Sequence, residues 1–166
     1  MQRLASRPDP TDVLQEAARL GVTWLDTADV YGAVPGDAER LLRPWVGRFR
    51  VCTKVGLVRD GRAWRPDGRP SHLLEAAERS RERLGVDCLD LCLWHAPDPR
   101  TEVASSARAL ARVEQRGIAR AVGVANLTAG QLREAARHVR IAALQVEVSP
   151  VHHEAVRSGV IEVART

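Results

Sequence analysis

Short apolar segments alternate along the chain with longer segments in which apolar residues recur every three or four positions. The short segments are residues 22–26, 50–54, 88–94, 120–124 and 142–146. Brief apolar runs bordered by glycine or polar residues are typical of strands that are buried on both faces. The longer, amphipathic segments predict helices over residues 12–20, 37–46, 73–84, 102–116, 130–139 and 153–165.

Single residues mark the ends of several of these helices. Gly85 and Gly117 each follow a helical segment, where glycine can adopt the left-handed conformation that ends a helix. Thr128 and Gln131 have the spacing of a capping box at the start of the fifth helix. The last helical segment is interrupted at Ser158-Gly159, so we expect a break there.

The strict alternation of strands and helices predicts a parallel sheet with right-handed crossovers. Such a sheet is either doubly wound or part of a (β/α) barrel. The chain contains neither G-x-G-x-x-G nor G-x-x-x-x-G-K-[ST], so nothing marks a nucleotide site of an open sheet, and we favour the barrel. A closed barrel takes about 250 residues, whereas this chain has 166. We therefore expect one α/β domain over residues 1–166 that forms a partial TIM-type barrel of about five strands.

An incomplete barrel leaves its two outer strands without hydrogen-bond partners and leaves apolar surface uncovered. Another chain that pairs with these strands would complete or cover the sheet. We therefore expect a homodimer or a higher oligomer.

Composition excludes several classes of protein. No run of eighteen apolar residues occurs, and the first ten residues lack the apolar core of a secretory signal, so neither a membrane span nor export is predicted. The three cysteines lie in apolar segments without metal-ligand spacing, which favours buried thiols, a cytoplasmic protein and no metal site. The net charge is +4, but only 4% of the residues are aromatic, so we do not expect nucleic-acid binding.

The longest segment between predicted elements, residues 55–70, holds four arginines, three glycines and Trp64. It follows the carboxyl end of a strand, where parallel barrels place their active sites. Two interpretations stay open, a lid or substrate loop over the site and a solvated linker. In the first, we expect Trp64 to contact the substrate.

Polar side chains follow the predicted strands at their carboxyl ends, which meet at one rim of a parallel sheet. Asp26 and Tyr31 follow the first strand, Lys54 the second and His95 the third. Tyr31 is the only tyrosine, and Lys54 is the only lysine beside 24 arginines. Chance would rarely place both single residues on one rim, so we expect a functional site there. Trp24 lies two positions before Asp26 and is therefore predicted to point to the same face of the sheet, towards the site, as a substrate contact.

These residue types suit acid–base chemistry. An unperturbed tyrosine has a pKa of about 10, and an adjacent ammonium group lowers it by favouring the phenolate. A buried aspartate would hold the lysine charged, and a histidine on the opposite side would orient a carbonyl oxygen. Such a site gives a proton to a carbonyl oxygen or takes one from an alcohol.

Five segments resemble the aldo-keto reductase family in their order and spacing. The family's D-T-A-x-x-Y-G signature is matched by VTWLDTADVYG (22–32), and its lysine strand by VCTKVG (51–56). Its histidine strand is matched by LDLCLWHAPDP (89–99). Its G-V-S-N and Q-x-x-Y-S segments are matched by AVGVANLT (121–128) and ALQVEVSP (143–150).

The resemblance implies a role for each residue at the rim. Tyr31 would be the general acid, and Lys54 and Asp26 would tune its pKa. His95 would orient the substrate carbonyl. The implied substrate is a small carbonyl or hydroxyl compound.

The resemblance also implies a nicotinamide site. Asn126 and Gln145 stand where the family holds the carboxamide of NADPH. Ala125 and Val148 depart from the family pattern, which has serine and tyrosine at these positions. The match begins at the family's first helix and ends near its sixth, so we expect the strands that grip the cofactor phosphates to be missing.

Three functional hypotheses follow. The one favoured by the sequence is a cofactor-free lyase or isomerase that uses the acid–base set for dehydration, isomerisation or cyclisation in specialised metabolism. The second is an NADPH-dependent carbonyl reductase whose barrel is completed by a second chain. The third is a non-catalytic binding or scaffolding protein. NADPH binding distinguishes the reductase from the cofactor-free enzyme. An effect of Tyr31→Phe on activity distinguishes both enzymes from the non-catalytic protein.

Overall fold

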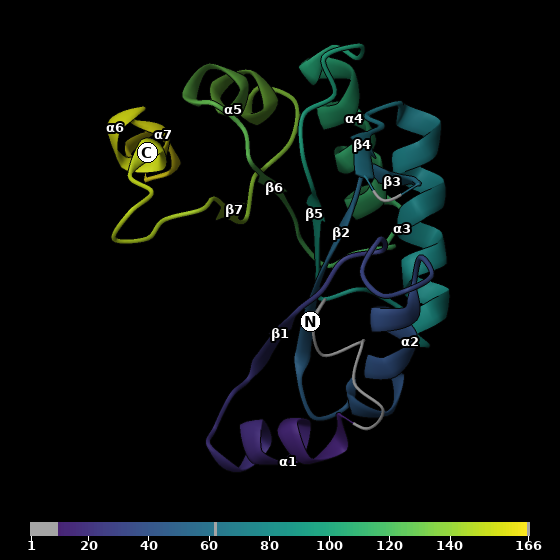
Figure 1. Ribbon diagram of the computed structural model, residues 1–166. Coiled ribbons are helices and arrows are strands. Elements are labelled where there is room, and N and C mark those ends of the chain that lie inside the picture. The colour runs from purple at the N-terminus through teal and green to yellow at the C-terminus, as the bar shows by residue number, and fades with distance from the viewer. Residues whose placement is uncertain (1–9, 62, 166) are drawn as a thin grey trace.

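The computed structural model describes residues 10–61 and 63–165. Its main sheet has five parallel strands in the order β1-β2-β5-β6-β7. The strands are β1 (Trp24–Asp26), β2 (Arg50–Val55), β5 (Leu91–Trp94), β6 (Val122–Ala125) and β7 (Leu144–Gln145). The sheet curls into an arc with helices along its outer side (Figure 1). The prediction of a partial parallel barrel is therefore confirmed.

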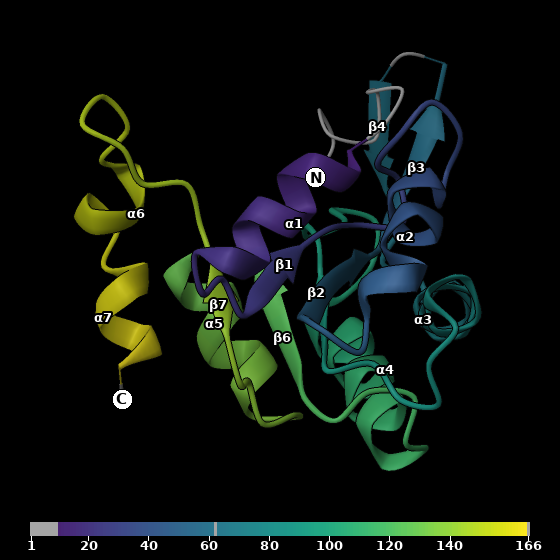
Figure 2. The same cartoon turned by 90° about the horizontal axis from the view of Figure 1, so that it is seen from below.

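Helices connect the strands in the order expected for a barrel. They are α1 (Thr11–Arg19), α2 (Asp37–Leu42), α3 (Pro70–Leu84), α4 (Val103–Gln115), α5 (Ala129–Ala136), α6 (Glu154–Arg157) and α7 (Val160–Ala164), with a 3₁₀ turn, η2 (Arg43–Trp45), after α2. Figure 2 shows α6 and α7 beyond β7, on the opposite side of the molecule from α2 and α3. Within the described ranges, no helix has both the length and the apolar character that crossing a bilayer requires.

The predicted helix ends are present. Gln131 donates its backbone N–H to Thr128 Oγ1 at 3.3 Å, and Gln131 Oε1 accepts from the backbone N–H of Thr128 at 3.0 Å, which completes the capping box of α5. Gly85 ends α3 at a φ of +70°. Gly159, at a φ of +72°, separates α6 from α7, as expected from the interruption in the pattern.

The core lies between the outer face of the sheet and the helices. Val55 and Trp94 are fully buried there, and they pack in one cluster with Leu73 of α3 and Leu110 of α4. Because side chains alternate along a strand, Lys54 points to the concave side instead. The strand alternation therefore separates the packing residues from the candidate functional residues.

The segment after β2 forms a hairpin, which the sequence reading missed. Strands β3 (Leu57–Asp60) and β4 (Ala63–Pro66) pair antiparallel, with Asp60 opposite Ala63. Gly61 lies in the turn at a φ of +58°. An Asp-Gly pair between two extended segments is a strong hairpin signal. The segment is therefore a β-hairpin and not an irregular loop, and its function as a lid stays a prediction.

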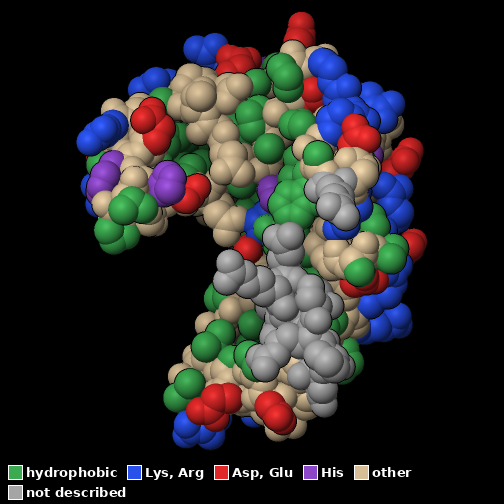
Figure 3. Space-filling model, in the orientation of Figure 1, with side chains coloured by type: hydrophobic (Ala, Val, Ile, Leu, Met, Phe, Trp, Pro, Cys, Tyr) green, Lys and Arg blue, Asp and Glu red, His purple; other side chains and the backbone are tan. Residues whose placement is uncertain are grey.

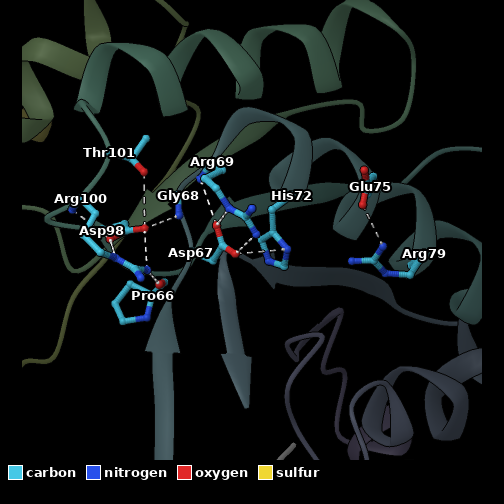
Figure 4. A network of polar contacts seen from close by, with 10 residues as sticks. All are labelled: Pro66, Asp67, Gly68, Arg69, His72, Glu75, Arg79, Asp98, Arg100 and Thr101. Carbon is cyan, nitrogen blue, oxygen red and sulfur yellow. Dashed lines mark hydrogen bonds and ion pairs between the residues drawn. The ribbon is translucent and has the colours of Figure 1, made fainter. Parts of the chain in front are cut away.

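A polar network fixes the base of this hairpin to the segment after β5 (Figure 4). Asp98 Oδ2 accepts a hydrogen bond from the backbone N–H of Gly68 at 3.0 Å, and Arg100 donates to the carbonyl oxygen of Pro66 at 2.6 Å. The hydroxyl of Ser106 donates to the carbonyl oxygen of Gly68 at 2.7 Å. Both ends of β4 are thus held, one by the turn and one by this network.

The concave face of the arc is open. Figure 3 shows the molecule hollowed between the part that contains α1 and the part that contains α6 and α7. Strands β1 and β7 are the outer strands of the sheet, each paired on one side. The oligomer expected to cover them stays a prediction.

Candidate active site

Backbone hydrogen bonds continue the strand pairing beyond the strands and up to the rim. The N–H of Asp29 donates to the carbonyl oxygen of Lys54 at 3.0 Å, and the N–H of His95 donates to the carbonyl oxygen of Val55 at 2.9 Å. The segments that follow β1, β2 and β5 are therefore held at one level. This register brings Lys54 and His95 to the loop that carries Tyr31.

Lys54 is the centre of the cluster. Its Nζ donates to Asp26 Oδ2 at 2.6 Å and to the carbonyl oxygen of Thr27 at 2.8 Å. The Lys54 side chain is 3% exposed, but that of Asp26 is 47% exposed. The expectation of a buried aspartate is therefore wrong, because β1 is an outer strand and Asp26 borders the open hollow.

Three side chains surround the ring of Tyr31. Lys54 Nζ lies 5.4 Å from the ring centroid, and the imidazole of His95 meets the ring edge-on at a centroid distance of 5.8 Å. The indole of Trp64, on β4, lies 5.8 Å away on another side. The structure thus brings together the four residues of the predicted acid–base set and one of the two predicted substrate-contacting tryptophans.

The electrostatics of Tyr31 differ from the expectation. Burial raises the pKa of the Tyr31 phenol above its usual value, and the carboxylate of Asp26 raises it further. Burial and Asp26 outweigh the lowering expected from Lys54, whose ammonium group is paired with Asp26 at 2.6 Å. At neutral pH the phenol therefore keeps its proton and is a donor.

His95 is a neutral ring in a confined position. Burial, and after it the positive charge of Lys54, lower its pKa to about 4. Its Nδ1 is buried and has no hydrogen-bond partner among the described residues. A neutral imidazole carries one N–H, so the other ring nitrogen, Nε2, is free to hold the proton.

The two amide residues lie beside this cluster. Asn126 has a φ of +60°, a left-handed conformation that asparagine tolerates better than most residues. Its Nδ2 donates to the carbonyl oxygen of His95 at 2.9 Å. Gln145 Nε2 donates to Asp26 Oδ1 at 3.2 Å, and both amide side chains belong to exposed residues. The predicted nicotinamide residues therefore adjoin the acid–base set at the open hollow.

Trp24 does not join the cluster. It lies two residues before Asp26, and its indole stacks on the guanidinium of Arg50 at 5.7 Å. Together with Asp90 and Arg120, these residues line a pocket of about 500 Å³ at the amino ends of the strands. The alternation of side chains along β1 correctly predicted the face on which Trp24 lies. It did not show that Trp24 lies at the amino end of the sheet, away from the acid–base set.

Arg59 is a residue of this site that the sequence reading missed. From β3, it donates to the carbonyl oxygens of Val30 and Gly32 at 3.1 and 2.6 Å. These carbonyls flank Tyr31, so Arg59 holds the loop that positions the phenol. The Asp-Gly turn was the signal that could have placed β3, and with it Arg59, beside this loop.

Other chemistries find no support in the part of the chain that the structure describes. No three His, Cys, Asp or Glu side chains are grouped so that they could hold a metal ion within it. Ser149 Oγ and Glu147 Oε1 both lie 3.4 Å from the same nitrogen, Nδ1, of His152. A nucleophilic serine needs the base to contact serine and carboxylate through different nitrogens, so this group is no catalytic triad.

Comparisons with known proteins point to one family. A sequence model of the Aldo/keto reductase family matches residues 4–166. Oxidoreductase YdhF of Escherichia coli K12 is 33% identical over 160 residues, which is 90% of this chain and 54% of that protein. Aldo-keto reductase yakc (NADP(+)) of Schizosaccharomyces pombe is 31% identical over 163 residues, 92% of this chain and 47% of that protein.

A solved structure extends the likeness to the fold. The glycerol dehydrogenase AKR11B4 of Gluconobacter oxydans superimposes with a TM-score of 0.83 at 28% identity, over 98% of this chain and 52% of that chain. This chain spans about half the length of the relatives that it matches. The matches in sequence and in fold show that the chain belongs to the aldo/keto reductase family.

Proposed function

We propose that this chain is the acid–base half of an NADPH-dependent carbonyl reductase, in which Tyr31 gives its proton to the substrate's carbonyl oxygen. The observation that carries the proposal is the Tyr31 ring, which lies 5.4 Å from Nζ of buried Lys54 and meets the imidazole of His95 edge-on. Relatives with oxidoreductase names, one of which carries NADP(+) in its name, support the reductase hypothesis. They lend no support to the cofactor-free lyase or isomerase that the sequence favoured.

Tyr31 is suited to the donor role by its protonation state. Its raised pKa keeps the phenol intact at neutral pH, so the proton is present when a carbonyl oxygen gains charge. After the transfer, the phenolate lies beside Lys54, whose Nζ is 5.4 Å from the ring centroid. The ammonium group therefore offsets part of the cost of forming the phenolate in this half-buried position.

His95 is suited to orient the carbonyl. With its proton on Nε2, the neutral ring donates a hydrogen bond to the same oxygen that receives the proton from Tyr31. Its pKa of about 4 keeps the ring neutral, so it does not compete with Tyr31 as an acid. The edge-on contact of the two rings sets both donors on one side of the hollow.

The amide residues fit the nicotinamide end of the cofactor. Asn126 and Gln145 use their amide nitrogens within the chain, which leaves their oxygens to accept hydrogen bonds from a carboxamide. When bound, NADPH supplies a hydride to the carbonyl carbon. The rest of the barrel, which would hold the cofactor phosphates, would come from a second chain or a longer form of this one.

Calorimetric titration of NADPH into the protein tests the proposal. We expect saturable binding that is weakened by Gln145→Ala but not by Gln115→Ala, an exposed glutamine at the end of α4. Asn126 is left unchanged because alanine would be strained at its positive φ. The same titration is made with the form whose barrel is complete. Absence of binding up to about millimolar cofactor in both would overturn the reductase proposal and favour the cofactor-free hypothesis.

A further inference from the structure

A separate pocket lies between the loop after β1, strand β3 and helix α3. It has a volume of about 260 Å³. The charged and titratable residues that line it are Asp29, Arg59, His72, Arg79 and Arg83. None of them belongs to the acid–base set, so this pocket calls for its own explanation.

The pocket gathers polar atoms that have no partner. Among the described residues, seven buried side-chain nitrogen or oxygen atoms lack a hydrogen bond, and three of them come from residues that line this pocket. They are Asp29 Oδ1, Arg59 Nε and His72 Nε2. A buried polar atom without a partner is costly, so three at one pocket indicate a missing ligand that would satisfy them.

The charge of the lining is predominantly positive. Arg83 is paired with Glu39 at 3.1 Å, and Arg79 only loosely with Glu75 at 3.6 Å on the surface. Among the described residues, Arg59 donates hydrogen bonds only to backbone carbonyl oxygens. Three guanidinium groups therefore face a pocket in which a single acid, that of Asp29, is buried.

Burial keeps the carboxyl group of Asp29 protonated at neutral pH, so it adds no negative charge beside the arginines. Burial, and after it the nearby carboxylate of Glu39, raise the pKa of Asp29 to about 8. At neutral pH, Asp29 is therefore a hydrogen-bond donor. Burial also lowers the pKa of His72, although Asp67 lies 3.9 Å from its Nδ1 (Figure 4).

We propose that this pocket binds a small tetrahedral oxyanion, a phosphate or sulfate group, between Arg59, Arg79 and Arg83. Asp29 and His72 supply further hydrogen bonds from the atoms that now lack a partner. Arginine forks match the geometry of such oxyanions and bind them through charge-assisted hydrogen bonds. The site goes beyond the proposed reductase function and needs neither cofactor nor turnover.

Calorimetric titration with inorganic sulfate, against chloride at equal ionic strength, tests the site. We expect saturable binding of sulfate that Arg79→Gln weakens by about tenfold. Arg79 is chosen because it is partly exposed and its loss leaves the buried Glu39–Arg83 pair intact. The matched control is Arg108→Gln, an exposed arginine on α4 that makes the same change in net charge.

Two results would overturn the proposal. One is the absence of saturable sulfate binding up to about 10 mM. The other is equal weakening by Arg79→Gln and Arg108→Gln, which would assign the binding to overall charge instead of to the pocket.

The pH dependence tests the part played by Asp29. Sulfate keeps its charge across the neutral range, so a fall in its affinity as the pH rises through about 8 reports ionisation of Asp29. The pKa of His72 is lowered from 6.5, so this ring is already neutral there, and Glu39 and Glu75 stay paired with arginines. We expect Asp29→Asn to remove the fall. The same fall in the Asn variant would contradict a donor role for Asp29.

A phosphate monoester shows whether the site takes the phosphate group of an organic molecule or the free inorganic ion. If glycerol phosphate binds more tightly than inorganic phosphate, the site takes the phosphate group of an organic ligand. If it binds more weakly, the site takes the free ion, and either result supports an oxyanion site. Failure of both to displace sulfate would contradict it.

Discussion

Lys54 Nζ lies 2.6 Å from Asp26 Oδ2, and this pair joins a buried cation to a half-exposed anion. The pairing satisfies the only lysine of the chain, whose burial would otherwise be costly. It also cancels much of the positive charge that Tyr31 would experience. The phenol therefore keeps its proton until a substrate draws it away.

Spectrophotometric titration of Tyr31 tests this relationship, because Tyr31 is the only tyrosine. We expect the phenolate to form at a pH above the usual value for tyrosine, since burial and Asp26 both raise the pKa. Asp26→Asn should lower the midpoint, because it removes the anion and leaves Lys54 unpaired. The exposed Asp87→Asn serves as control. A wild-type midpoint below the usual value would show that Lys54 dominates after all.

Much of this site follows from the sequence, and the missed parts have physical causes. Parallel strands carry Lys54 and His95 to the same rim, so the cluster could be predicted from alternation alone. The pKa of Tyr31 could not, because it depends first on the burial of the ring and then on the position of the Asp26 carboxylate. The position of Trp24 was missed because alternation along a strand predicts only the face of the sheet on which a side chain lies. It does not predict how far that side chain is from the carboxyl end of the strand.

His95 should destabilise the protein in mild acid. Its pKa is about 4 when folded and near 6.5 when unfolded, so the unfolded chain binds the proton first as the pH falls. The free energy of unfolding should therefore decrease between about pH 6.5 and pH 4. His95→Gln should flatten this part of the stability curve, measured by urea unfolding. An identical slope in both proteins would mean that His95 is charged in the folded state.

Asp29 should destabilise the protein as the pH rises, whereas His95 does so as the pH falls. Its folded pKa of about 8 exceeds the ordinary 3.8, so the unfolded chain loses its proton first as the pH rises. The wild type should lose stability between about pH 4 and pH 8, and Asp29→Asn should be more stable by about 1–3 kcal/mol at the upper end. Chemical unfolding across this range measures the difference. A less stable Asn variant at about pH 8 would indicate a folded-state carboxylate.

The buried pair of Glu39 and Arg83 should matter most for stability. Glu39 is fully buried, accepts from the hydroxyl of Thr53 at 2.6 Å and from Arg83 at 3.1 Å, and so ties α2 to β2 and α3. Glu39→Ala should cost about 3–5 kcal/mol in the free energy of unfolding, because it leaves the mostly buried guanidinium of Arg83 without this acceptor.

The control for this variant is an ion pair of similar length on the surface. Glu16 and Arg19 on α1 lie 2.6 Å apart, but both are exposed. Exposed pairs contribute little because water screens them, so Glu16→Ala should leave the unfolding midpoint unchanged within error. A loss as large as that of Glu39→Ala would show that charge removal, not burial, sets the cost.

The central claim is that Tyr31 protonates a carbonyl while NADPH is consumed. Its most direct test follows the absorbance of the reduced nicotinamide with a panel of aldehydes, for the wild type and for Tyr31→Phe. We predict aldehyde-dependent oxidation of NADPH that falls by about 10²–10⁴-fold in the Phe variant. Equal rates in the two proteins, or turnover of a carbonyl compound without any loss of NADPH, would contradict it.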